Sequence, residues 1–414
     1  MQKTKARGVQ IFLVGMLFCF AAAGMGCSEG GGKKGADDSG KTVAKPDQAQ
    51  VQRVSLVSDL VEGRKVFEAK NCSQCHSIFE RERKTGPKLQ SSRFYGSFLD
   101  TFSLLWNHAP AMAVHMRKEV LERPQFSTTE LNQLVSFLYM LPYLGQPGDP
   151  RRGEALLKEK ACYSCHSLGG RGKKGGIGLD SLKTFQSQVV LLQRMWNHGP
   201  MMLSQMAATR TPIPTFSGND IADIFAALSE QGKESRKVFL GVGNASHGQK
   251  MFTEKGCIKC HSIFGKGGNE GPDLGRAVSQ SNVTMLSTRL WNHAGAMREK
   301  FRQKKLDWPI FSETEMNDLI VFLYSLNYED KPGNPGKGEE VFGRKKCADC
   351  HFRTAADKKK IVDDIKSVNS IQFATLLWNH IPSMEASMVI HGVPWPEMSG
   401  DELRGVLAYL QSQK

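Results

Sequence analysis

The chain has 414 residues, 40% of them hydrophobic, and this length corresponds to two or three domains. Its formal net charge of +14 is of the size found in proteins that bind nucleic acid or anionic membranes. Lys3, Lys5 and Arg7 lie in the first 26 residues, which hold no acidic residue, so the remainder carries +11. Eight of the ten cysteines form four CxxC pairs and the other two lie near the N-terminus, which argues against a disulfide framework.

Residues 1–26 have the pattern of an export signal: a basic start, an apolar run from Ile11 to Ala23, and small residues after it. The apolar run is short for a membrane span. The residues before Cys27 resemble the cleavage box of bacterial lipoproteins, although Gly24 stands where that box prefers Leu. A single unpaired thiol is unusual in an exported protein, so we expect Cys27 to be lipidated. An ordinary cleaved signal and an uncleaved anchor are the alternatives.

Residues 27–56 are rich in Gly, Lys, Asp, Ser, Gln and Pro, which predicts a flexible linker. Clusters of Gly and Pro then divide the rest of the chain into four segments of similar length. We call these segments modules 1 to 4: residues 57–146, 147–238, 239–332 and 333–414. The linkers between them are short, so neighbouring modules are expected to stay in contact.

Each module contains one Cys-x-x-Cys-His motif, and the motifs start 90, 95 and 90 residues apart, which indicates a tandem array. The two thiols of such a motif lie about one helical turn apart, so both can reach the vinyl groups of one porphyrin, with the imidazole beneath the iron. The motifs therefore predict four covalently bound haems c. The attachment thiols are those of Cys72, Cys75, Cys162, Cys165, Cys257, Cys260, Cys347 and Cys350, and the proximal iron ligands are His76, His166, His261 and His351.

A zinc site is the alternative use of paired cysteines, but zinc does not need a histidine after every second cysteine. Four haems would also bring up to eight propionate charges, which would lower the net charge to roughly +3. Nucleic acid is therefore not expected as a partner, whereas a mildly basic face of the protein could bind an acidic partner.

The pattern around each motif predicts helices throughout. A short amphipathic helix precedes the motif, a Gly- and Lys-rich loop follows it, and an apolar helix then ends in Trp-Asn-His. A last amphipathic helix starts at a serine that is followed three residues later by an acid, as in a capping box. These N-cap serines are Ser127, Ser217, Ser312 and Ser399. The expected fold is all-α, with four tandem small helical domains.

This order of elements resembles the class I cytochrome c family over residues 57–414. The Gly-Pro-x-Leu loop of that family occurs as Gly86 to Leu89 and as Gly271 to Leu274. It is reduced to Gly178-Leu179 in module 2 and absent from module 4. The resemblance implies the same proximal histidines as the motifs do.

The distal iron ligand of that family is a methionine shortly before the last helix, but the matching residues here, Arg123, Ile213, Trp308 and Trp395, cannot serve. The Trp-Asn-His motif offers two replacements in every module. The favoured candidates are Met112, Met202, Met297 and Met384, and the alternatives are His108, His198, His293 and His380.

Methionine is favoured because a proline between the two candidates suggests that the helix restarts there, so that the methionine lies just past a helix end. The Trp-Asn-His residues could then orient the ligand without binding the iron themselves. A further methionine, at Met116, Met206 and Met388, is replaced by Phe301 in module 3 and so cannot be the common ligand.

The expected function is a tetrahaem cytochrome that relays electrons between redox partners, such as quinol-linked membrane complexes, and that is not an enzyme. The expected location is the periplasm or outer cell envelope, through a lipid anchor. A haem enzyme, such as a peroxidase or oxyanion reductase, would need one open iron, and the same two ligand candidates in all four modules argue against it. An extracellular filament subunit is a third alternative.

Overall fold

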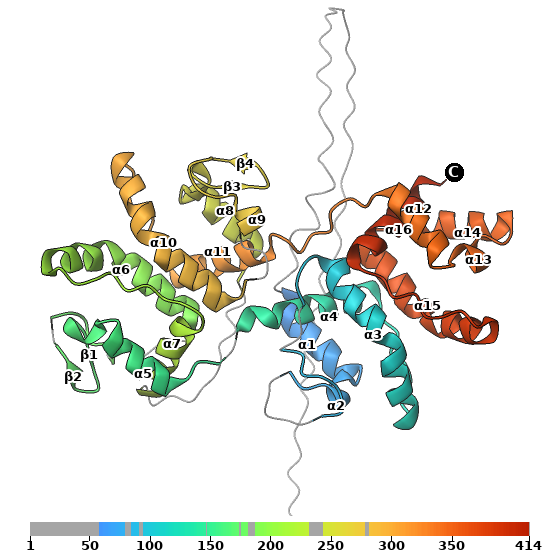
Figure 1. The fold of residues 1–414 in the computed structure, drawn as a ribbon, viewed down its shortest axis with the longest axis horizontal. Coiled ribbons are helices and arrows are strands. Elements are labelled where there is room, and N and C mark those ends of the chain that lie inside the picture. The colour runs from blue at the N-terminus through green and yellow to red at the C-terminus, as the bar shows by residue number, and fades with distance from the viewer. Residues whose placement is uncertain are drawn as a thin grey trace, which may run out of the picture. The chain divides into compact units, whose positions relative to one another are not determined.

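The computed structural model describes residues 58–78, 84–90, 94–145, 147–173, 175–180, 187–231, 243–277 and 281–413. The expected signal, the lipidation site at Cys27 and the linker lie outside the described residues. Most of the described residues are helical, so the predicted all-α class is confirmed (Figure 1). None of the helices described is both long and apolar enough to span a membrane.

The helices and short strands follow the order expected for each module. Module 1 contains α1 (Ser58–Ala69), α2 (Cys72–Cys75), α3 (Phe98–Lys118), α4 (Thr128–Met140) and the 3-10 turn η2 (Pro142–Leu144). Module 2 contains α5 (Pro150–Glu159), η3 (Cys162–Ser164), β1 (Ser167–Leu168), β2 (Arg171–Gly172), α6 (Gln188–Thr209) and α7 (Asp220–Gln231). Module 3 contains α8 (Ala245–Glu254), η4 (Cys257–Lys259), β3 (Ser262–Ile263), β4 (Lys266–Gly267), α9 (Leu274–Ala277), α10 (Val283–Gln303) and α11 (Glu313–Ser325). Module 4 contains α12 (Pro335–Arg344), α13 (Ala348–His351), α14 (Ala355–Ile365), α15 (Ser370–His391) and α16 (Gly400–Ser412).

Two small hairpins replace part of the loops expected after the motifs of modules 2 and 3. Strand β1 pairs antiparallel with β2, with Leu168 opposite Arg171, and β3 pairs with β4, with Ile263 opposite Lys266. Gly169 and Gly170 form the first turn with φ of 55° and 79°, a backbone that favours glycine.

The first and last helices of each module contact each other: α1 with α4, α5 with α7, α8 with α11, and α12 with α16. A glycine in the first helix makes this close approach possible in every module. A Cβ on Gly153 would lie 1.9 Å from the carbonyl oxygen of Asp223, and one on Gly248 would lie 2.0 Å from that of Asp318. The equivalent glycines are Gly63 and Gly338. Only glycine fits at these crossings, a constraint that the amphipathic pattern does not reveal.

The predicted capping boxes are present at three of the four last helices. The side chains of Ser127, Ser312 and Ser399 each accept a hydrogen bond from the amide three residues later, and the glutamate there accepts from the serine amide. In module 2 Asp220 accepts from the Ser217 amide at 3.0 Å, and α7 begins at Asp220 itself. The start signals in the sequence therefore placed the last helices to within a few residues.

The modules also pack on one another, and one hydrophobic cluster contains residues from all four. Helix α3 of module 1 contacts α15 and α16 of module 4, and α6 of module 2 contacts α10 and α11 of module 3. Modules 1 and 3 meet through a reciprocal pair of hydrogen bonds. The Tyr139 hydroxyl donates to the Tyr324 carbonyl at 2.9 Å, and the Tyr324 hydroxyl to the Tyr139 carbonyl at 2.8 Å. The thin core expected for a module of this size is thus extended by its neighbours.

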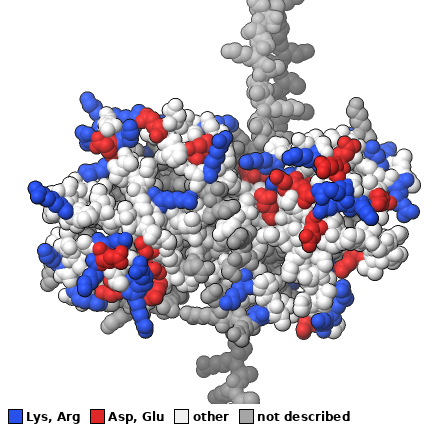
Figure 2. All heavy atoms as spheres, in the orientation of Figure 1, with Lys and Arg blue, Asp and Glu red and all other residues white. Residues whose placement is uncertain are grey.

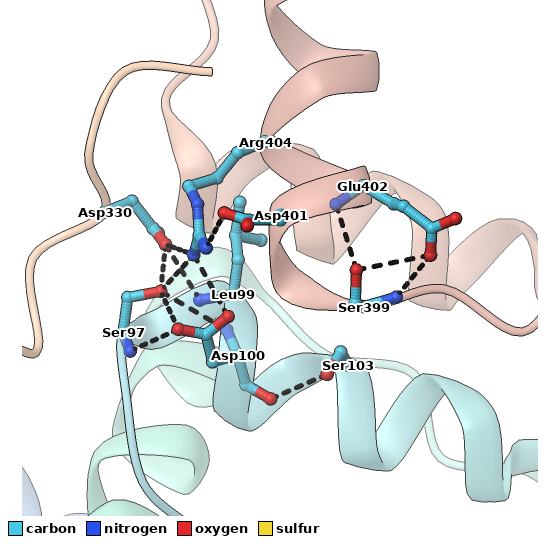
Figure 3. A network of polar contacts seen from close by, with 9 residues as sticks. All are labelled: Ser97, Leu99, Asp100, Ser103, Asp330, Ser399, Asp401, Glu402 and Arg404. Atoms are coloured by element: carbon cyan, nitrogen blue, oxygen red, sulfur yellow. Dashed lines mark hydrogen bonds and ion pairs between the residues drawn. The ribbon is translucent and has the colours of Figure 1, made fainter. Parts of the chain in front are cut away.

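A polar network joins modules 1 and 4 to the chain segment between α11 and α12 (Figure 3). Arg404 of α16 donates to the carboxylates of Asp330 and Asp100, both at 3.2 Å, and to the Ser97 hydroxyl at 2.6 Å. The side chains of Arg404 and Asp330 are only 13% and 8% exposed. The network therefore places a buried ion pair where three parts of the chain meet.

The charged side chains do not form a field of one sign on the face drawn in Figure 2, where Lys and Arg lie among Asp and Glu. Charged side chains of the described residues form ion pairs with N···O distances of 3.0 Å or less, such as Lys70 with Glu130, Lys255 with Glu315, and Arg344 with Glu402.

Candidate haem-binding sites

Each Cys-x-x-Cys-His motif forms a single helical turn directly after the first helix of its module. The residue before the first cysteine has a left-handed backbone, with φ of 63° at Asn71, 58° at Ala161, 81° at Gly256 and 60° at Lys346. The histidine amide then donates to the carbonyl of the first cysteine at 2.9–3.0 Å in all four motifs. This is the turn that the spacing predicted, with the two thiols about one helical turn apart.

The first thiol of each motif lies against the hydrophobic cluster. Burial raises the pKa of these thiols, those of Cys72, Cys162, Cys257 and Cys347, to about 11. All eight motif cysteines are free of disulfide bonds. Among the described residues, no group of three or more His, Cys, Asp or Glu side chains is arranged to hold a metal ion.

Three of the proximal histidines have a fixed ring orientation. Their Nδ1 atoms lie 2.9–3.1 Å from a backbone carbonyl oxygen: His76 from Pro87, His166 from Ile177, and His261 from Pro272. A carbonyl can only accept, so Nδ1 carries the proton and the lone pair is on Nε2. That tautomer is the one in which Nε2 can bind iron.

The loop that supplies these carbonyls packs directly on the imidazole. A Cβ on Gly86 would lie 2.7 Å from the His76 ring, one on Gly176 would lie 2.8 Å from the His166 ring, and one on Gly271 would lie 2.4 Å from the His261 ring. The interpretation of module 2 therefore needs correction, because its loop is complete. Gly176 and Ile177 take the places of Gly and Pro, and because Ile replaces Pro the sequence pattern indicated only Gly178-Leu179.

Module 4 has no such loop, as expected. Helix α13 lies within its motif and α14 follows closely, and Phe352 packs on Phe342 with ring centroids 4.8 Å apart. Within the described residues, no hydrogen bond between a backbone carbonyl and the His351 ring is seen, in contrast to the other three modules.

A second histidine faces the proximal one in every module. The ring centroids are 6.0 Å apart for His76 and His108, 6.3 Å for His166 and His198, 6.2 Å for His261 and His293, and 5.7 Å for His351 and His380. An imidazole nitrogen binds a metal at about 2 Å and lies about 1 Å from its ring centre, so two rings on opposite sides of one metal have centres about 6 Å apart. The residues present thus fit an iron held between two imidazoles.

Burial lowers the pKa of all four facing histidines. Repulsion from the proximal imidazole lowers the pKa further for His108, His198 and His293, and Lys360 has this effect on His380. A neutral imidazole is the form that binds a metal.

Methionine was favoured because the helix was expected to restart after the proline, and this expectation is wrong. Helices α3, α6 and α15 run without interruption through Pro110, Pro200 and Pro382. Each candidate methionine therefore lies one turn further along the same helix. Met112, Met202, Met297 and Met384 are half-buried and pack against the hydrophobic cluster. The geometry favours the histidines, and the ligand itself stays a prediction.

The Trp and Asn of Trp-Asn-His contact another module, a role that the sequence did not reveal. Each indole N–H donates to a proline carbonyl at 2.7–2.8 Å, and each Asn side chain makes two hydrogen bonds of 2.8–3.0 Å with the backbone two residues after that proline. We call this arrangement the Trp-Asn clasp. The clasps join Trp106 to Pro396, Trp378 to Pro124, Trp196 to Pro309, and Trp291 to Pro214. Modules 1 and 4 therefore hold each other reciprocally, as do modules 2 and 3.

Comparison with known proteins agrees with this chemistry. Residues 245–327, which contain the third motif and its facing histidine, match the family model described as Cytochrome c. The match supports a c-type cytochrome, with covalently bound haem c and a role in electron transfer. A haem c held in this way supplies one-electron oxidation and reduction. Neither the comparison with curated proteins nor that with solved structures finds a match.

Proposed function

We propose that the protein is a tetrahaem c-type cytochrome that relays electrons between redox partners in the cell envelope. The observation that carries the proposal is the recurrence of one arrangement four times, a helical Cys-x-x-Cys-His turn with a second imidazole 5.7–6.3 Å from the proximal ring. In each module the two thiols would attach the haem, and the protein would supply ligands and spacing.

We further propose that His108, His198, His293 and His380 are the distal ligands. The facing rings support this choice over the methionines, which the sequence favoured because they were expected just past a helix end. Two imidazoles give a lower reduction potential than an imidazole with a thioether. The protein would therefore belong to a low-potential route, toward extracellular or metal acceptors.

The cofactor load tests the proposal directly. Protein produced with a cytochrome c maturation system should have an intact mass greater than that of the processed chain by four haems, because each motif offers two thiols for covalent attachment. The motif thiols should also fail to react with alkylating agents. A chain that carried zinc and no haem would contradict the proposed function.

The location is proposed from the N-terminal sequence, with a lipid on Cys27 that ties the protein to a membrane through the linker. Cells fed labelled palmitate should incorporate the label into the wild-type protein and not into Cys27→Ser, because acylation needs the thiol. Equal labelling of both proteins, or of neither, would remove the lipid anchor from the proposal.

A further inference from the structure

Prolines inside the clasp helices leave a backbone carbonyl without a helical donor. A proline has no N–H, so the carbonyl four residues earlier loses its hydrogen bond. Pro110 lies four residues after Trp106 in α3, and Pro200 lies four residues after Trp196 in α6. The carbonyl that each proline frees therefore belongs to the tryptophan of the clasp itself.

In both cases the partner module provides the missing donor. The indole N–H of Trp395, in module 4, donates to the Trp106 carbonyl at 3.2 Å, and that of Trp308, in module 3, donates to the Trp196 carbonyl at 3.2 Å. The indoles also pack on each other, with ring centroids 4.6 Å apart for Trp106 and Trp395 and 4.3 Å apart for Trp196 and Trp308. Trp395 directly precedes Pro396, whose carbonyl accepts from Trp106. Trp308 directly precedes Pro309, whose carbonyl accepts from Trp196.

Module 3 shows the opposite combination. Gly295 replaces the proline, so the helix position that pairs with the Trp291 carbonyl has its N–H. The residue that meets this helix from module 2 is Ile213, whose side chain has no donor. A cavity of about 230 Å³ remains beside it, lined by Ile213, Pro214, Trp291 and Gly295 among others.

The remaining helix, α15, contains Pro382 and meets Arg123 of module 1. The Arg123 guanidinium lies 5.8 Å from the ring centre of Trp378 and donates to Glu385 of α15 at 3.2 Å. This clasp thus also faces a side chain with N–H donors. Nη2 of Arg123 donates to Glu385 and to the Ala109 carbonyl, and Nη1 is buried without a hydrogen-bond partner among the described residues.

We propose that the residue before the clasp proline matches the clasp helix of its partner module, by supplying a donor where a proline has freed the tryptophan carbonyl. An indole donor fits a helix in which proline has freed the tryptophan carbonyl, and an aliphatic side chain fits a helix that contains glycine. A side chain without a donor that faces a proline-containing helix leaves the buried tryptophan carbonyl unpaired. An indole that faces the glycine-containing helix gains no hydrogen bond. The surface is therefore an interface selective for a second module of this chain.

A double-mutant cycle in modules 1 and 4 tests the match in the intact haem-loaded protein. Trp395→Phe keeps an aromatic ring and removes the donor, so hydrogen exchange of the Met398 amide, which is held by Asn107, should become roughly fivefold faster. Pro110→Ala restores an N–H to α3, so the same Trp395→Phe substitution in that background should change the exchange rate by less than about twofold. Equal acceleration in both backgrounds, or none in either, would overturn the proposal.

The second pair offers the reverse experiment, with an internal control. Gly295→Pro should free the Trp291 carbonyl and make exchange of the Phe216 amide at least about tenfold faster. Adding Ile213→Trp should reverse most of that change, whereas Ile213→Phe, which also fills the cavity, should not. If phenylalanine rescues as well as tryptophan, packing and not donor recognition explains the pairing, and the inference fails even though the protein still carries its haems.

Discussion

His293→Ala should open the third iron to carbon monoxide, while Met297→Ala should leave the spectrum of the haem unchanged. The His293 ring lies 6.2 Å from the His261 ring, centre to centre, which is the separation of two imidazoles on one metal. Loss of that ring leaves one axial position free for an added ligand. The titration should therefore reach one carbon monoxide per protein, since three other modules keep both imidazoles.

Module 3 is the best place for this comparison because Phe301 occupies the position of the second methionine found in the other modules. No thioether one turn beyond Met297 can then replace a lost ligand. Met297→Leu, which preserves the volume of the side chain, is the control for packing damage. Carbon monoxide binding by Met297→Ala, with His293→Ala silent, would establish thioether ligation and a higher potential. Binding by the wild-type protein would instead favour the haem-enzyme alternative.

Arg404→Ala should lower the free energy of unfolding by about 3 kcal/mol, because it leaves a buried carboxylate without its cation. Asp330 is 8% exposed on its side chain and loses the guanidinium at 3.2 Å, and Asp100 loses the same partner. Urea unfolding followed by circular dichroism would measure the loss. Arg344→Ala is the matched control, since Arg344 is 52% exposed and pairs with Glu402 at the surface, where we expect less than about 1 kcal/mol.

The same variant should show a pH dependence of known sign. Burial raises the pKa of Asp330, and hydrogen bonds from Ser97 and Leu99 oppose that rise. An acid whose pKa is higher in the folded state holds its proton better there, so its contribution to stability falls as the pH rises. Without Arg404 the ionised Asp330 carboxylate destabilises the folded state further. The decrease in the free energy of unfolding should therefore be larger at about pH 7 than at about pH 5. A loss that does not change with pH would show that Asp330 is not its source.

Local signals in the sequence predicted the parts of the fold that depend on neighbouring residues. The serine caps at Ser127, Ser312 and Ser399 and the helical turn at Cys72 need only residues a few positions away. The pairing of Trp106 with Pro396 could not be read in the same way, because the two residues are 290 positions apart and the acceptor is a backbone carbonyl. Proline at 110 was misleading for a related reason, since the donor to the carbonyl that it frees belongs to another module.

The pairing order has a consequence for the way the chain reaches its folded state. The clasp hydrogen bonds between modules 2 and 3 span 76 to 114 positions, whereas those between modules 1 and 4 span 253 to 291 positions. Contacts over long sequence separations form slowly and late. During synthesis the inner pair can close while the outer pair must wait for module 4 to emerge. Module 1 therefore spends that interval with its Trp106 face uncovered, so this face is open to premature association until module 4 covers it.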